Sequence, residues 1–493
     1  MTFLDLGLLV PVSPLPLPPT THPKLTLSTG LGFLDHMVDQ IRSHGQFSIG
    51  VDFRFSSSSS PSSSSSSSPP PPSPPSISSV NYNTDCQAST FSTVGHLLGS
   101  EIKTLLSTIS SDSPTSSTFS CPLDESLIKV SKYVGVERRA WSVRAYSSVR
   151  TSCCCCCCCW RVSSVPFRSV NSFHFISIHF MSLNNHIRIF FSQCTICQFD
   201  NQFYSSSLPP YGNRSVLGQT ETAHFELFWQ SLSNSSGLSL NFEKLRGSNG
   251  HHIIEASFKA FSRGLRKLLD ERRSEEPGHS QFNFLPSPLR TGQIDRSTNE
   301  TSVKVSVVLD GGTDGSSAVS TGLATVDEVL LAIAESAEMS LKVSAVGDLW
   351  IDDHHTSEDV SIALGQCLNQ AIGTKAGLNR MWSCTSGGVE CVMDVSNRPF
   401  FCMDGILDEG LGQEQEMVGD LATEMVEHMF GSIVFNAGMS VHMVRTESES
   451  ETKTNSDLVL DSAKAFGSCL KFCLAVDERR GGGTASSKGT LSV

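Results

Sequence analysis

An internal repeat constrains the fold of this chain more than any other feature of the sequence. The segment STGLATVDEVLLAIAESAEMSL, which begins at Ser320, aligns without gaps on STGLGFLDHMVDQIRSHGQFSI, which begins at Ser28. A repeat with a period of roughly 290 residues indicates two related units in one chain. We call residues 25–273 copy one and residues 289–493 copy two.

Low-complexity segments precede, interrupt and separate these copies. Residues 1–24 are proline-rich, and residues 56–80 are nearly all serine and proline, a composition that buries too little apolar surface to fold. Residues 147–210 contain an unbroken cysteine run, Cys153 to Cys159, and show no stable period. We predict a disordered N-terminus, a linker at residues 274–288, and two insertions in copy one that are either functional or retained intron sequence.

Composition excludes several classes of function. The formal net charge of −13 opposes non-specific binding to nucleic acid, which needs a basic surface to release counterions from phosphate. No apolar run reaches the roughly 18 to 20 residues that span a membrane, and the N-terminus lacks the basic residues of a signal or transit peptide. We expect a cytosolic protein that binds neither nucleic acid nor membrane.

The stretch DDHHTSED, residues 352–359, concentrates side chains that bind metals. On a helix, His354 and Glu358 lie four residues apart and share one face, while His355 points about 100° away. The two histidines therefore belong to neighbouring metal sites. Imidazole and carboxylate ligands suit divalent zinc, manganese or iron. The alternative is a solvated helix start with Asp353 near the N-cap.

A second cluster repeats this geometry in copy one. His251 and Glu255 are four residues apart and His252 is offset by one, at the start of an amphipathic helix. Two His-His-x-x-Glu motifs at helix N-termini favour a dinuclear metal site over structural histidines. The residues that mark the buried face of this helix are Ile254, Phe258, Phe261, Leu265 and Leu268.

Hydrophobic periodicity predicts further elements. Apolar spacing predicts a helix around Phe33, Leu34, Met37 and Ile41, in which a lone histidine, His36, is structural unless another group recruits it. We also predict a helix over residues 92–106, a strand over residues 122–130, and a strand within TSVKVSVVLDGG at the start of copy two.

Eight short segments together resemble one family. They are FLDHM at Phe33 and HHIIEASFKAF at His251 in copy one, and TNET at Thr298, DDHHTSED at Asp352, LNR at Leu378, SNRP at Ser396, VEHMF at Val426 and SSKG at Ser486 in copy two. Both copies resemble imidazoleglycerol-phosphate dehydratase, the manganese enzyme of histidine biosynthesis. The resemblance covers residues 25–55, 85–145, 211–273 and 289–493.

The resemblance implies an α+β fold of the ribosomal protein S5 domain 2-like type. Each copy would consist of two similar halves, and each half would be a four-stranded sheet backed by two helices. The family also implies imidazoleglycerol phosphate as substrate and self-association into a shell-like homo-oligomer, with metal ligands drawn from more than one subunit. Because photosynthetic eukaryotes make histidine in plastids, a plastid is the alternative to the cytosol.

Two Mn²⁺ ions per complete site are also implied by the resemblance. The first ion would use His36, His355, His251 and Glu255. The second ion would use His354, Glu358, His428 and His252. This division agrees with the separation of the two i, i+4 pairs by helix geometry.

The family chemistry assigns further roles. Glu300 of TNET matches the glutamate that shuttles the proton removed from the carbon chain, and we group it with His354, His355 and Glu358 as the catalytic set. Two cations stabilise negative charge on the substrate ring as a hydroxyl leaves. The positions that match the phosphate-binding residues are Arg380, Arg398, Ser486, Ser487 and Lys488. Taken singly, each of these residues is more often a solvated surface group.

Neither copy has the complete pattern, and their losses are nearly complementary. Copy one has Ala88, Ser89, Ser92 and Leu227 at the positions of His354, His355, Glu358 and His428, and it lacks the TNET and SSKG segments. Copy two has Glu328 at the position of His36, and DLVLD at residues 457–461 in place of HHIIE.

We therefore expect a working site where the first half of copy two meets the second half of copy one. That junction would offer Glu328, His355, His251 and Glu255 to one ion, since glutamate can replace histidine as a ligand of a hard metal. It would offer His354, Glu358 and His252 to the other ion, with water in the vacant place. The alternative is a catalytically impaired structural or interaction relative that retains partial metal binding.

Overall fold

The structure is a computed structural model of the chain. It describes residues 4–6, 10–13, 29–50, 53–55, 84–107, 115–134, 176–183, 186–193, 204–274, 289–310, 317–403, 405–407, 417–446, 453–480, 482–486, 488 and 490–491. The predictions for the Ser/Pro tract, the cysteine run and the linker lie outside these residues, apart from Ser274 at the start of the linker. No helix in the described ranges is long and apolar enough to cross a membrane.

Two compact units make up the chain. Gly135–Asn201 form one unit, whose described part is an antiparallel hairpin of β7 (Ile176–Leu183) and β8 (His186–Gln193). The other unit contains both copies. Within the N-terminus that we predicted to be disordered, β1 (Leu4–Leu6) and β2 (Val10–Ser13) pair with two short strands of copy one.

Three four-stranded sheets in the described residues share one topology. Each has an antiparallel hairpin, a third antiparallel strand and a short parallel strand at the far edge. The sheet of copy one contains β5 (Thr115–Leu123), β6 (Ser126–Val134), β12 (Ser239–Arg246) and β9 (Tyr204–Ser206), in that order. Because β9 belongs to this sheet, copy one resumes inside the tract 147–210 that we predicted to be an insertion.

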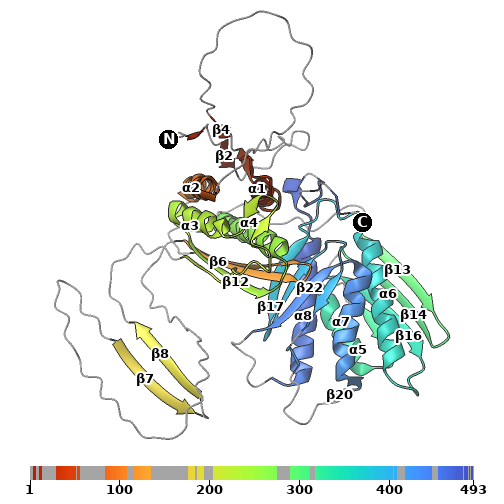
Figure 1. The fold of residues 1–493 in the computed structure, drawn as a ribbon. Helices are drawn as coiled ribbons and strands as arrows, with labels where there is room; N and C mark the ends of the chain where they lie inside the picture. Colours follow the sequence, from red (N-terminus) through yellow and green to blue (C-terminus); the bar gives the residue numbers. More distant parts are fainter. Residues whose placement is uncertain are drawn as a thin grey trace, which may run out of the picture. The chain divides into compact units, whose positions relative to one another are not determined.

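Copy two has the two predicted halves. Its first sheet contains β13 (Thr291–Ser297), β14 (Thr301–Val308), β16 (Ser340–Gly347) and β15 (Ala318–Ser320), and its second contains β17 (Met381–Ser386), β18 (Val389–Asp394), β22 (Ser440–Arg445) and β19 (Phe400–Cys402). The helices are α5 (Ala324–Ala337), α6 (His354–Ile372), α7 (Thr423–Ala437) and α8 (Asn455–Leu474). Helix α6 packs on the first sheet and on α7, while α8 packs on the second sheet and on α5 (Figure 1).

Copy one repeats this helix pairing around a single four-stranded sheet. Helix α1 (Gly32–Gly45) packs on α4 (Gly250–Ser274), and α2 (Thr84–Ser107) packs on α3 (His224–Ser236). In the described residues, the first half has no four-stranded sheet and contributes only β3 (Ser48–Gly50) and β4 (Phe53–Phe55) beside its helices. The α+β class is confirmed, and three of the four expected half-sheets are present.

Short elements complete the two copies. The two-stranded ribbon β10 (Val216–Leu217) and β11 (Thr220–Glu221) precedes α3, and its counterpart β20 (Met417–Val418) and β21 (Leu421–Ala422) precedes α7. A single 3-10 turn, η1 (Glu478–Arg480), follows α8.

Local sequence explains most of these elements. All five residues that mark the apolar face of α4 are fully buried, and alternation along β14 buries Val303, Val305 and Val307. The single strand predicted over residues 122–130 is wrong, because Asp124 adopts a positive φ of 48° in a two-residue turn that splits it into the β5–β6 hairpin.

The two copies contact each other through their second halves. Strand β5 packs against β17, β18 and β22. At this contact Glu390 accepts hydrogen bonds from Ser120 Oγ (2.6 Å) and Lys129 Nζ (3.0 Å), and the Trp382 ring meets Phe119 edge-on. The contact therefore joins different halves from those that we expected to meet.

Candidate metal centre

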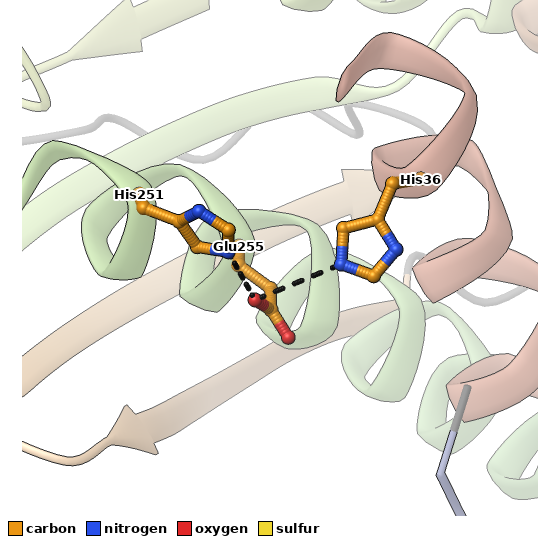
Figure 2. Close-up of side chains that lie close together, drawn as sticks. All are labelled: His36, His251 and Glu255. Carbon is orange, nitrogen blue, oxygen red and sulfur yellow. Dashed lines mark hydrogen bonds and ion pairs between the residues drawn. The ribbon is translucent and has the colours of Figure 1, made fainter. Parts of the chain in front are cut away.

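Group one consists of His36, His251 and Glu255 in copy one. Helix α4 presents His251 and Glu255 on one face, because they lie one turn apart, and α1 packs alongside with His36 facing them (Figure 2). Glu255 Oε2 lies 3.0 Å from His251 Nε2 and 3.9 Å from His36 Nε2. All three ligand atoms lie within 4.8 Å of one another, close enough to hold one metal ion.

The electrostatics of group one favour the ligand forms of its side chains. Burial opposes ionisation of Glu255, but Lys259 Nζ at 2.7 Å and the hydrogen bond with His251 lower its pKa well below the usual range. Burial also lowers the pKa of His36, although the charge of Glu255 works in the opposite direction. A metal binds ionised carboxylates and neutral imidazoles, so these pKa shifts prepare both groups for a cation.

Group two consists of His354, Glu358 and His428 in copy two. His354 and Glu358 lie on one face of α6, and His428 comes from α7, which packs against it. Glu358 Oε1 lies 3.0 Å from His428 Nε2, and Glu358 Oε2 lies 3.9 Å from His354 Nε2. The three ligand atoms again lie within 4.8 Å of one another. Both groups thus contain two imidazoles and one carboxylate at nearly the same distances.

His252 and His355 lie outside the two groups. His252 Nδ1 is 2.9 Å from Glu125 Oε2, and His355 Nδ1 is 3.1 Å from Asp348 Oδ2. The hydrogen bond to Asp348 raises the pKa of His355, and the negative charge of Glu300 adds to this rise. The separation of His354 from His355 that helix geometry predicted is therefore present in the structure.

Glu328, the predicted substitute for His36, joins no ligand group in the described residues. It lies exposed on α5, and the groups that could hold a metal contain His36 and His428 instead. Group one is thus built from residues of copy one alone, and group two from residues of copy two alone. The mixed set that we expected at the junction between copies is not formed in the described part of the chain.

Packing fixes which residues correspond between α4 and α8. Ser262 of α4 donates a hydrogen bond to the backbone carbonyl of Ile41 (2.8 Å). Ile333 is the counterpart of Ile41 in the repeat. Gly467 of α8 lies against the carbonyl of Ile333, because a Cβ added to this glycine would be 2.4 Å from that oxygen. Gly467 therefore corresponds to Ser262. This correspondence shifts the sequence alignment by one residue, so that Ser456, Asp457 and Leu460 stand at the positions of His251, His252 and Glu255.

The other replacements, in copy one, agree with the sequence alignment. Gly99 of α2 lies against the carbonyl of Leu232, since a Cβ added there would be 2.5 Å from that oxygen. Gly365 of α6 lies in the same way against the carbonyl of Ile433, with a corresponding distance of 2.6 Å. This correspondence places Ala88, Ser89 and Ser92 at the positions of His354, His355 and Glu358. Leu227 stands at the position of His428 and is 38% exposed. Copy one thus lacks group two.

The predicted phosphate-binding residues differ in their availability. Arg380 is buried, with Nε and Nη2 each 2.7 Å from a carboxylate oxygen of Asp394, and its Nη1 donates to the carbonyl of Ala485. Arg398 is half-exposed, and its Nε lies 3.5 Å from Asp124. Lys488 is exposed, and its backbone N–H donates to Ser486 Oγ (3.2 Å). Ser487 lies outside the described residues.

Sequence reasoning assigned no contact at the site to three carboxylates, of which it named only Asp353, as a residue near the N-cap. Glu125 and Asp348 hold His252 and His355, and Asp353 accepts from the backbone N–H of Ala422 (2.6 Å). Asp353 is the N-cap residue of α6, but its side chain makes no capping hydrogen bond, so it links α6 to the start of α7 instead. A turn at Asp124–Glu125 was the one local signal available, and the strand assigned there concealed it.

Comparison with known proteins finds relatives in one enzyme family. A sequence model of the imidazoleglycerol-phosphate dehydratase family matches residues 191–265 and 321–470. The imidazoleglycerol-phosphate dehydratase of Prochlorococcus marinus (strain MIT 9211) is 37% identical over 207 residues, which are 41% of this chain and 93% of the relative. A chloroplastic imidazoleglycerol-phosphate dehydratase of Triticum aestivum is 37% identical over 208 residues, 41% of this chain and 72% of the relative.

A solved structure is also similar in sequence. The crystal structure of imidazoleglycerol-phosphate dehydratase from Staphylococcus aureus subsp. aureus N315 is 25% identical, with a TM-score of 0.32, and the match covers 38% of this chain and 99% of that one. Since relatives more than 30% identical to this chain are matched over nearly their whole length, the chain belongs to the imidazoleglycerol-phosphate dehydratase family.

Proposed function

We propose that this protein is a manganese-dependent lyase that dehydrates imidazoleglycerol phosphate to imidazole-acetol phosphate in histidine biosynthesis. The observation that carries the proposal is the pair of matching groups, each with two imidazole nitrogens and one carboxylate oxygen within 4.8 Å of one another. In the reaction a carbon–hydrogen bond and a carbon–oxygen bond of the glycerol chain break, and the two fragments leave as water. Catalysis therefore needs a group that moves a proton and groups that hold the ring and the phosphate.

The donor sets of both groups fit Mn²⁺. Imidazole nitrogen and carboxylate oxygen are borderline and hard ligands, and no described cysteine belongs to either group. When bound, the two cations supply Lewis acidity that stabilises negative charge on the imidazole ring. Lys259 occupies the second oxygen of Glu255, so this carboxylate can offer one oxygen to a cation.

Glu300 is the group that we assign to proton transfer. It lies in the exposed turn between β13 and β14, where its backbone N–H donates to Thr298 Oγ1 (3.2 Å). Its negative charge contributes to the raised pKa of His355, at the helix start that carries His354 and His355. A carboxylate in this position can exchange a proton with the carbon chain of a bound substrate.

Of the predicted phosphate-binding residues, some can contact the phosphate directly and one positions the others. Arg398 and Lys488 are cations with exposed side chains that can reach a phosphate. We assign Ser486 and Ser487, which precede Lys488 in the sequence, to the same role. Arg380 is already saturated by Asp394 and Ala485, and Ala485 directly precedes Ser486. We therefore assign Arg380 the role of a positioning residue that anchors the C-terminal segment.

The family resemblance also extends the proposal to partners and compartment. We propose that the chain self-associates into a shell-like homo-oligomer with imidazoleglycerol phosphate as its substrate. The wheat relative is named chloroplastic, which supports the plastid as an alternative to the cytosol.

A turnover assay tests the proposal. Purified protein is stripped with a chelator and reloaded with Mn²⁺, and product formation from imidazoleglycerol phosphate is measured. We expect activity that depends on Mn²⁺, and Glu300→Gln should lower kcat by roughly 100- to 10,000-fold, the range for loss of a general acid or base, without changing the manganese content. The exposed Glu335 of α5 provides a matched control, because Glu335→Gln should leave both quantities unchanged.

One alternative is favoured by a specific observation. Each group has only three ligands among the residues that the structure describes, and Arg380 is not free to contact a phosphate. These features would also suit a catalytically impaired structural or interaction relative. Stoichiometric manganese binding without any turnover would identify that relative, and absence of both binding and turnover would contradict the two proposals together.

A further inference from the structure

The turn that carries Glu300 is held by side chains rather than by glycine or proline. Residues 298–301, which we call the TNET turn, run from the end of β13 to the first residue of β14 and contain neither of these residue types. Instead, Thr298 Oγ1 accepts hydrogen bonds from the backbone N–H groups of Glu300 (3.2 Å) and Thr301 (3.0 Å). The backbone position of Glu300 therefore depends on what holds these two threonines.

Asp359 of α6 contacts the base of the TNET turn. Its Oδ2 accepts a hydrogen bond from Thr301 Oγ1 (2.5 Å), and Thr298 Oγ1 lies 3.4 Å from the same oxygen. Its Oδ1 accepts a hydrogen bond from Arg296 Nε (2.8 Å), and Arg296 Nη2 lies 2.7 Å from this oxygen. Both carboxylate oxygens of Asp359 thus bind the turn or the strand that leads into it.

The burial of Asp359 makes this contact resistant to motion. Only 9% of its side chain is exposed. A buried carboxylate is tolerated when a cation and hydrogen-bond donors compensate its charge, and here Arg296 and Thr301 supply them. If the TNET turn moved away, the carboxylate would remain buried with fewer donors. The free energy of that state opposes displacement of the turn.

Asp359 also links the turn to the helix that carries the metal ligands of group two. It directly follows Glu358 on α6, and successive residues of an α-helix point about 100° apart. Glu358 meets His428 of α7, whereas Asp359 meets the first sheet of copy two, on which α6 packs. Neighbouring residues of one helix thus hold a metal ligand group on one side and the TNET turn on the other.

The corresponding helix of copy one does not have this carboxylate. The correspondence of α2 with α6 places Thr93 at the position of Asp359. Copy one also lacks the TNET segment. Of the two corresponding helices, only the one beside a TNET turn carries an acid at this position, as a role in holding Glu300 requires.

We infer that Asp359 is a positioning residue that fixes the TNET turn against α6, so that Glu300 keeps one place relative to the ligands of group two. This inference rests on the proposed function and adds the residue that prepares Glu300 for proton transfer. A reacting group is effective when its supporting contacts hold it to within about 0.5 Å. Because both oxygens of Asp359 already accept hydrogen bonds, this residue acts through Glu300 rather than on the substrate.

The second half of copy two offers a matched carboxylate for comparison. Asp461 of α8 lies beside the turn between β17 and β18, with its Oδ2 3.4 Å from the backbone nitrogen of Gly388 and in an ion pair with Lys453. This turn consists of two glycines and carries no acid. Asp461 therefore tests the general effect of removing a carboxylate that binds a hairpin turn.

A double-mutant cycle tests the inference. Asp359→Asn should lower kcat by about 10- to 100-fold, as expected when a reacting group is misplaced by about 1 Å, with KM and manganese content within about twofold of the wild type. In a Glu300→Gln background the same substitution should lower kcat by less than about threefold, because the group that it positions is already absent. Asp461→Asn should leave kcat unchanged in both backgrounds.

A second variant tests the contact without removing the buried charge. Thr301→Val deletes the hydroxyl that donates to Asp359 and keeps the shape of the side chain, so it should lower kcat by roughly 3- to 10-fold. Thr301→Ser retains the hydroxyl and should stay within about twofold of the wild type. This pair of variants decides the question even if Asp359→Asn does not fold.

Hydrogen exchange provides a measurement that does not need turnover. The amides of Glu300 and Thr301 are bonded to Thr298 Oγ1, so they should exchange at least about tenfold faster in the Asp359→Asn variant than in the wild type or in Asp461→Asn. The Thr301→Val variant should show a smaller increase in the same peptide.

The outcomes separate this inference from the proposed function. If the wild type turns over substrate, then equal losses of kcat in both backgrounds, or a loss of manganese in step with kcat, would overturn the inference while the proposed function stands. If the wild type shows no turnover, the proposed function fails. Faster exchange in Asp359→Asn would then still show that Asp359 holds the turn, and unchanged exchange would refute the contact itself.

Discussion

Copy one and copy two contain the same kind of ligand triad, but they place it between different pairs of helices. In copy one the triad lies between α1 and α4, and in copy two it lies between α6 and α7, although both copies contain counterparts of all four helices. The helix pairs pack in the same way in both copies. The difference teaches that the framework is set by buried apolar faces, while each ligand group depends on a few half-exposed positions that can be lost without loss of the fold.

The cores of the two copies differ in chemistry as well. In copy one, Trp229 packs against Phe228, Phe242, Phe258 and Phe261, with ring centroids 4.4–5.1 Å apart. The core of copy two relies on sulfur-containing and aliphatic side chains, among them Met393, Cys391, Cys469 and Cys473. Burial raises the pKa of Cys473, so this thiol remains protonated and packs as an apolar group. Two different core compositions thus support one arrangement of helices on a sheet.

The largest expected difference between the copies concerns a buried ion pair found in copy two. Asp394, which holds Arg380, pairs with Ser440 across the sheet, and Tyr133 stands at the equivalent place in copy one, opposite Ser239. Arg380→Ala should lower the free energy of unfolding by about 3–5 kcal/mol, because it leaves a buried carboxylate without its partner. Denaturant unfolding measures this loss. Arg380→Ala with Asp394→Ala should recover part of it, and a cost below about 1 kcal/mol would show that the pair does not anchor the sheet.

The next largest change in the free energy of unfolding should come from Lys132, a buried lysine of copy one. Lys132 is fully buried over the Phe261 ring, and its Nζ has no hydrogen-bond partner among the described residues. Its counterpart is Met393, since Lys132 faces Leu240 and Met393 faces Val441 in equivalent ladders. Lys132→Met should raise the free energy of unfolding by about 1–3 kcal/mol, the cost of an unsatisfied buried polar group. Met393→Lys in copy two should lower it, and a destabilising Lys132→Met would refute the equivalence.

The same lysine predicts a pH dependence of stability. Burial lowers the pKa of Lys132 well below its ordinary value near 10.5. Between the folded and unfolded pKa values the unfolded chain binds the additional proton, so wild-type stability should rise as the pH rises through this window. Unfolding curves recorded at increasing alkaline pH measure this rise, and the Lys132→Met variant should lack it. An identical pH profile for the two proteins would show that Lys132 is not neutral in the folded state.

The smallest expected effect compares the carboxylates that hold the two outward histidines. Glu125→Gln and Asp348→Asn each remove a carboxylate from a histidine Nδ1, and each should weaken Mn²⁺ binding by about 10- to 100-fold without loss of fold. Asp348 is nearly buried and Glu125 is one-third exposed, so Asp348→Asn should have the larger effect. Metal titration measures both. Glu243→Gln, an exposed change on β12, is the control, and equal affinity in all three variants would remove these carboxylates from the site.

Much of the fold could be predicted from the sequence because its signals are local. Periodicity located α1, α4 and β14, and the repeat predicted that copy two would contain a second version of α1. Turns are harder to predict, and the turn at Asp124 contains no glycine in the sequence although Asp124 adopts a positive φ. The hairpin there was therefore read as one strand, and the carboxylate that holds His252 was missed with it.

The candidate site was predictable where its ligands lie one helical turn apart. His251 and Glu255 share one helix face through backbone geometry alone, and so do His354 and Glu358. The same geometry turns His355 away from His354. Glu328 was assigned as a ligand because it aligns with His36, but alignment does not report what faces a residue. Because α8 is shifted by one residue relative to the alignment, Leu460 rather than a carboxylate stands at the position that corresponds to Glu255, the residue that His36 faces in copy one.

The sequence by itself determined that this protein contains two incomplete copies of one fold and which residue types they retain. The family resemblance implied that His36 and His428 join the triads, but only the tertiary structure brings each histidine against the carboxylate that it meets, since each comes from a helix distant in sequence. The tertiary structure also decided that Arg380 is an anchor and that His252 and His355 point away from their own groups. Helical spacing fixes neighbours along one helix, whereas contacts between helices depend on how buried faces pack.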